Sequence, residues 1–213
     1  MKWIIGVLLL PACAGAVIAL WQVVRASGRA ETIWVATLAG AGCWLSIYLL
    51  LPKPMWVYVA GHELTHVVWA FVFGGRVKQF KVTSGGGHVV VTRNNFVIAL
   101  APYFFPLYAM LVVGVFAAGD RLWNWHRYVV WFHLLLGAAY AFHVTLTWHI
   151  LKAEQSDITA HGYLFSAVVV FLGNISVLLV GIPLLTGTVG VGAALRWWGQ
   201  STVALVARAG AWW

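Results

Sequence analysis

Residues 56–74 read WVYVAGHELTHVVWAFVFG, and this segment decides what kind of fold the chain adopts. It is apolar along its length except around three ionisable side chains, His62, Glu63 and His66. About 20 residues of helix cross a hydrocarbon core of about 30 Å, so the segment is just long enough to span one. Ionisable groups at membrane depth are costly and usually face a polar interior with a function. The segment therefore predicts a membrane helix that carries a functional site.

The rest of the chain also has the composition of a membrane protein. Of its 213 residues, 62% are hydrophobic and 8% are charged, whereas a soluble domain has about 25% charged residues. Six apolar segments are long enough to cross a bilayer: residues 3–24, 32–51, 56–74, 96–118, 128–151 and 162–186. We therefore expect an all-α polytopic membrane protein of about six transmembrane helices. We place it as a multi-pass protein in the cytoplasmic membrane of a prokaryote.

The basic surplus of the chain indicates contact with lipid headgroups. The formal net charge is +8, because thirteen Lys and Arg residues face five Asp and Glu residues. These bases are scattered singly over short loops, which is typical of interfacial anchors, so we expect the lipid bilayer and no nucleic acid as partner. Alternate loops carry nearly equal numbers of bases, and the positive-inside rule therefore gives no clear orientation.

The first apolar segment has some features of a signal peptide. Lys2, the apolar run after it and the small residues around Cys13 imitate a cleavage site. However, the apolar run continues through Val24, so we interpret the segment as an uncleaved first helix. Cys13 and Cys43 lie in apolar runs without CxxC spacing, and they predict neither a thiolate metal site nor a disulfide.

One connection between the apolar segments predicts β-structure. Residues 77–92 read VKQFKVTSGGGHVVVT, in which two β-prone runs flank Gly85-Gly86-Gly87. This pattern predicts a hairpin. Because an isolated two-stranded hairpin is only marginally stable in water, it needs support from the membrane surface or from the helices.

The spacing of His62 and His66 predicts a metal site. Residues i and i+4 of a helix share a face, so the two imidazoles can bind one ion. Glu63 lies beside them, where it can accept a proton from water that Zn²⁺ activates. We therefore predict one Zn²⁺ ion as cofactor, with His62 and His66 as ligands and Glu63 as the catalytic residue.

A catalytic zinc generally takes a third protein ligand, and the chain offers few acids. Glu31 and Asp120 lie in loops without polar surroundings. Glu154 and Asp157 lie together in LKAEQSDITAHG, residues 151–162, where Asp157 is nearer to the last apolar segment and can lie at a helix start. The residues alone leave four candidates for the third ligand: Asp157, Glu154, His149 and His143.

Four segments together resemble the site-2 protease family of intramembrane zinc metalloproteases. They are GHELTHVVWAFVFGG, the glycine-bearing hairpin, ALAPYFFPLY and QSDITAHG, in that order, and they lie within residues 56–175. The resemblance implies that His62, His66 and Asp157 bind zinc and that Glu63 activates water. It also implies membrane-anchored protein substrates. The family's Asp usually precedes Gly, whereas Ile158 follows Asp157, and an extra apolar segment, 128–151, intervenes. The chain would therefore be a divergent member.

The resemblance also gives the hairpin a role. A helix hides its peptide bonds, so intramembrane proteolysis needs an extended substrate, which an edge strand at residues 79–83 can hold by β-pairing. On this basis we divide the chain into two N-terminal helices (1–55), a metalloprotease core (56–186, with the hairpin at 77–92) and an interfacial or short helical tail (187–213).

Two other functions stay open at this point. One is a membrane zinc protease of another family, with Glu as third ligand. The other is a metal-binding membrane transporter or chaperone without catalysis.

Overall fold

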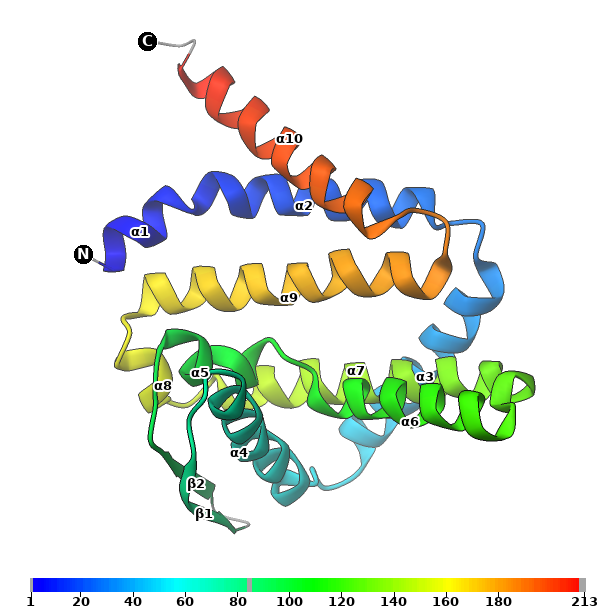
Figure 1. Cartoon of the computed structure of the whole chain (residues 1–213), viewed down its shortest axis with the longest axis horizontal. Helices are drawn as coiled ribbons and strands as arrows, with labels where there is room; N and C mark the ends of the chain where they lie inside the picture. Colours follow the sequence, from blue (N-terminus) through cyan, green and yellow to red (C-terminus); the bar gives the residue numbers. More distant parts are fainter. Residues whose placement is uncertain (1, 84–85, 211–213) are drawn as a thin grey trace. The chain divides into compact units, whose positions relative to one another are not determined.

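The computed structural model describes residues 2–83 and 86–210. The described chain is mostly helical and contains one two-stranded sheet, as predicted (Figure 1). The elements run in this order: α1 (Lys2–Leu8), α2 (Leu10–Ala26), α3 (Glu31–Leu50), α4 (Met55–Val72), β1 (Val77–Thr83), β2 (Gly86–Val91), α5 (Phe96–Leu100), the 3₁₀ helix η1 (Ala101–Tyr103), α6 (Leu107–Trp123), the 3₁₀ helix η2 (Trp125–Tyr128), α7 (Val129–Ile150), α8 (Ser156–Thr159), α9 (Tyr163–Thr186) and α10 (Val191–Gly210).

The chain divides into two compact units, and the first combines its two ends. This unit consists of Met1–Glu31 and Ser156–Trp213. Small residues let its helices approach closely: Gly15 of α2 lies against the backbone of Thr202 in α10, so that a Cβ there would lie 2.8 Å from the Thr202 nitrogen. The indole of Trp198 donates a hydrogen bond of 2.9 Å to the carbonyl oxygen of Ala12.

The second unit, Thr32–Gln155, contains α4, the hairpin and the broken segment after it. Two glycines bring α3 and α7 into backbone contact, because Gly40 lies against the carbonyl group of Leu134 and Gly137 against that of Thr37. A buried cluster of Trp44, Tyr58 and Leu146 joins α3, α4 and α7. The division into 1–55, 56–186 and 187–213 stays a prediction.

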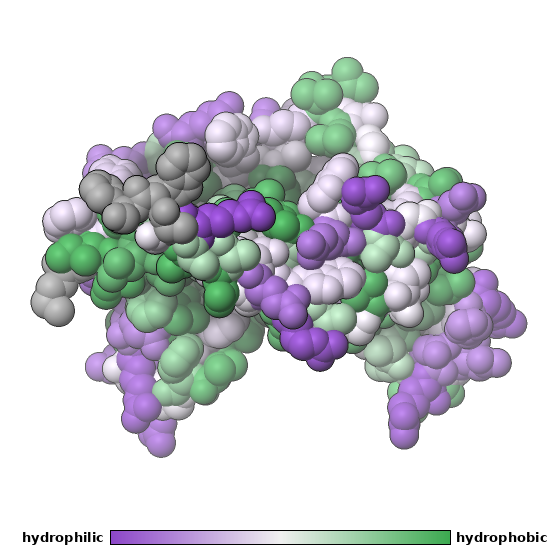
Figure 2. Space-filling model, turned by 90° about the horizontal axis from the view of Figure 1, so that it is seen from above, coloured by the Kyte–Doolittle hydropathy of each residue, from purple (hydrophilic) through white to green (hydrophobic). Residues whose placement is uncertain are grey.

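In the part of the chain that the structure describes, four helices are long and apolar enough to cross a membrane: Lys2–Ala26, Glu31–Leu50, Trp125–Ile150 and Tyr163–Thr186. Large apolar side chains lie on the surface, among them Leu8 at 72% and Leu50 at 81% exposure, and Figure 2 shows apolar side chains exposed between hydrophilic ones on the face it draws. In water such exposure would be costly. These features indicate a membrane protein.

Two of the six expected spans differ from the prediction. The segment expected at 96–118 is broken, because Phe96–Tyr103 and Leu107–Trp123 meet at 81°. Pro102 and Pro106 lie at this break. Counted as one span, the bent pair raises the number of candidate spans to five. Helix α4 forms as expected but is not among them, since its three ionisable residues lower its mean hydropathy.

The predicted hairpin is present and rests on α4. Strands β1 and β2 pair antiparallel, with Phe80 opposite Val89 and Thr83 opposite Gly86. Both strands contact α4, which gives the hairpin the support from a helix that its two strands need. The hairpin therefore lies next to the helix that carries the HELTH sequence.

Candidate metal centre

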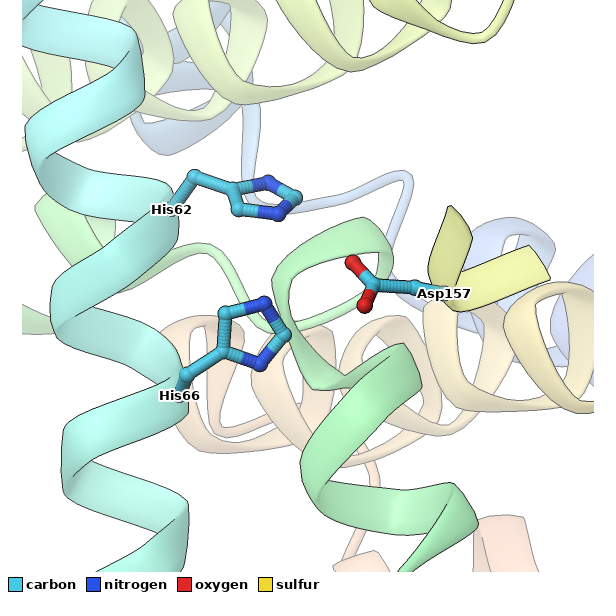
Figure 3. A group of neighbouring side chains, drawn as sticks. All are labelled: His62, His66 and Asp157. Carbon is cyan, nitrogen blue, oxygen red and sulfur yellow. The ribbon is translucent and has the colours of Figure 1, made fainter. Parts of the chain in front are cut away.

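Helix α4 presents His62 and His66 one turn apart on the same face. The two imidazoles project from the same side of the helix (Figure 3), with ring centroids 5.0 Å apart and planes at 77°. The helix follows Pro54, whose carbonyl oxygen accepts from the Tyr58 backbone nitrogen at 3.3 Å. His66 is only 8% exposed, and His62 is half-buried. The i, i+4 geometry predicted for one metal ion is therefore present.

The ring of His66 is held in one orientation. Its Nδ1 atom lies 2.9 Å from the carbonyl oxygen of Ile98, in the short helix α5. A carbonyl oxygen only accepts, so Nδ1 carries a proton, and Nε2 is the ring nitrogen that would bind a metal. In metal sites the second ring nitrogen of a ligand histidine usually donates to such a partner.

The sequence around Ile98 explains why its carbonyl group is available. The side chain of Asn95 accepts from the Ile98 backbone nitrogen at 2.9 Å and so caps the start of α5. In a regular helix the residue that would donate to the Ile98 carbonyl is four positions later, and this residue is Pro102, which has no N–H group. The proline that breaks the segment therefore leaves an acceptor for His66.

Glu63 is buried where the hairpin crosses α4. Its side chain is 7% exposed. A Cβ at Gly87 of β2 would lie 2.8 Å from the Glu63 Cγ atom and 2.9 Å from a methyl group of Val59. Strand β2 therefore packs directly on the side chain of Glu63, the predicted catalytic residue. The sequence pattern places Gly87 between the two β-prone runs, whereas in the structure it lies within β2, where a glycine marks the close approach of another group.

Asp157 lies at the start of a helix, as the sequence indicated. It is the second residue of the four-residue helix α8 and is half-buried. It acts on His161 within the same unit: burial and the Lys2 ammonium group lower the pKa of His161, whereas the Asp157 carboxylate raises it. The competing acid, Glu154, is exposed.

One group of side chains in the described chain could hold a metal ion. It consists of His62, His66 and Asp157, each of which offers one ligand atom (Figure 3). The other three candidates, Glu154, His149 and His143, do not belong to it. Because Asp157 belongs to the first unit and the histidines to the second, the assignment of Asp157 as third ligand stays a prediction.

The chain matches no known family, no characterised protein and no solved structure. The resemblance to site-2 proteases therefore stays a prediction, and the function has to be inferred from the residues of the site.

Proposed function

We propose that this protein is an intramembrane zinc metalloprotease, a divergent relative of the site-2 proteases, which hydrolyses peptide bonds of membrane-anchored protein substrates. The hydrogen bond between His66 and the Ile98 carbonyl carries the proposal, because it prepares His66 for a metal at one turn from His62. A buried glutamate, Glu63, follows His62 directly on the same helix.

The donor groups fit zinc. Two imidazoles and one carboxylate, from His62, His66 and Asp157, are a ligand set that Zn²⁺ accepts, and three protein ligands leave its fourth position open, as catalysis requires. In our proposal these three residues hold one Zn²⁺ ion. When bound, the ion would act as a Lewis acid that makes water nucleophilic at neutral pH and polarises a carbonyl group.

Glu63 would transfer the protons. Its carboxylate would accept a proton from the attacking water and then deliver it to the nitrogen of the leaving amine. Burial beneath β2 keeps bulk water away from this carboxylate and limits the positions that it can adopt. The carboxylate would thus be held in the orientation that proton transfer from the attacking water requires.

The hairpin would hold the substrate extended. In the described chain β1 and β2 form a two-stranded sheet, so each strand has an outer edge that can pair with an added strand. Both strands contact α4, and β2 lies on Glu63, so a peptide paired with the outer edge of β1 would extend the sheet that covers the proposed base.

The proposal is tested by comparing cells that express the wild-type protein with cells that express Glu63→Gln. The measurement is a survey of new N-termini among membrane proteins, together with the zinc content of the purified protein. We expect cleavage within apolar segments for the wild type, and a loss of at least about a hundredfold for Glu63→Gln at unchanged zinc content. If the two proteins gave the same N-termini and the same zinc content, the result would instead support a metal-binding transporter or chaperone.

A further inference from the structure

A third histidine lies beside the ligand face of α4. His143 of α7 is 6% exposed, and its Nε2 atom has no hydrogen-bond partner among the described residues. Buried polar atoms in proteins are nearly always hydrogen-bonded, so an exception needs an explanation such as a water molecule or an ion.

His143 lines a small cavity of the second unit. It has a volume of about 20 Å³, and both His62 and His143 line it, together with Thr65, Pro102 and Tyr108. A cavity of this size holds about one water molecule where two to four polar groups line it. The hydroxyl groups of Thr65 and Tyr108 donate to the carbonyl oxygens of Gly61 and Val57, so they can only accept a further hydrogen bond.

We infer that one water molecule in this cavity links His143 to His62, and that His143 is a positioning residue for the metal ligand His62. This inference rests on the proposed zinc site. His62 would bind the metal through one ring nitrogen and donate to the water through the other, while the water donates to Nε2 of His143. The bond between His66 and Ile98 is the direct counterpart of this arrangement on the neighbouring ligand.

Helix α7 supplies a matched control for the test. His133 has the same exposure as His143, 6%, and its Nδ1 atom also lacks a hydrogen-bond partner among the described residues. However, His133 does not line the cavity. If the loss of any buried histidine from α7 weakened zinc binding, substitutions at both positions would show the effect. If His143 acts through His62, only the substitution of His143 would weaken zinc binding.

The experiment measures the Zn²⁺ dissociation constant of the purified full-length protein by competition with a chelating dye, for His143→Leu, His143→Gln and His133→Leu. We expect about tenfold to hundredfold weaker binding for His143→Leu, which is the usual effect of losing such a partner. His143→Gln should bind zinc nearly as well as the wild type, since its amide can hold the water. His133→Leu should leave zinc binding unchanged.

Three results would overturn the inference: normal zinc affinity in His143→Leu, equal losses in His143→Leu and His133→Leu, or a loss in His143→Gln as large as in His143→Leu. The last result would make His143 a direct ligand, because a side-chain amide is a poor ligand for zinc. If the wild type itself bound no zinc, the proposed function would fail instead, and the two failures are therefore distinguishable.

Discussion

The Nδ1 atom of His66 lies 2.9 Å from the carbonyl oxygen of Ile98, and Pro102 is the reason that this oxygen is free to accept. The two residues are 32 positions apart. The contact fixes which ring nitrogen of His66 would face a metal in the proposed site, and it connects the break at 96–123 to α4. Pro102 thus both breaks the helical segment and leaves the acceptor that orients His66.

Replacing Pro102 by Ala should weaken zinc binding. The new N–H group can donate to the Ile98 carbonyl and so compete with His66, whose ring would lose its fixed orientation. We expect an increase of about tenfold in the Zn²⁺ dissociation constant, measured by chelator competition. Pro106→Ala is the control, because Pro106 lies at the same break but not four residues after Ile98. Equal effects of the two variants would contradict the role of Pro102.

Replacing Gly87 by Ala should reduce cleavage and leave zinc in place. The added methyl group would lie 2.8 Å from the Glu63 Cγ atom, so either the strand or the carboxylate has to move. Misplacement by about 1 Å can lower a rate by about a hundredfold. Gly114→Ala in α6 is the control, since no atom lies within 4 Å of a Cβ there. Normal cleavage by Gly87→Ala would show that Glu63 does not depend on the close contact with β2.

Proline substitutions at alternate positions of residues 79–83 should separate binding of the substrate from binding of the metal. The two sets are residues 79, 81 and 83, and residues 80 and 82. Proline removes the backbone N–H donor, and in one of these sets the N–H groups point away from β2, towards the outer edge of the sheet. That set should impair cleavage while zinc stays bound and the hairpin stays paired. The other set should disrupt the hairpin itself. If both sets left cleavage normal, the proposal that β1 holds the substrate would be wrong.

The third ligand can be assigned by comparing Asp157→Asn with Glu154→Gln. We expect Asp157→Asn to lose most of its zinc, because a neutral amide replaces an anionic ligand. Glu154 is exposed and lies outside the group that could hold a metal, so Glu154→Gln should keep its zinc. The zinc content of each purified variant is measured by metal analysis. The reverse result would indicate a zinc protease of another family.

Local patterns in the sequence predicted the parts of the fold that depend on local geometry. The spacing of His62 and His66 is enough to place both on one face of a helix. The β-prone runs around the glycines are enough to predict a hairpin. The mostly helical fold and the hairpin are therefore confirmed, and a group of residues that could hold a metal exists.

Features that depend on long-range contacts were not predictable in the same way. Nothing in the spacing shows that the Ile98 carbonyl meets His66, that Gly87 lies on Glu63, or that His143 shares a cavity with His62. Hydrophobicity alone also took 96–118 for a continuous span, although Pro102 and Pro106 interrupt it. Proline in a helix is typical of a kink, but the size of the bend, 81°, follows from packing that no local pattern encodes.

An experimental structure of the Glu63→Gln protein with zinc bound tests the central claim most directly. We predict one zinc ion with ring nitrogens of His62 and His66 and a carboxylate oxygen of Asp157 at about 2.0–2.2 Å, and one open position. Zinc bound through Glu154 in place of Asp157, or away from the two histidines, would contradict the claim.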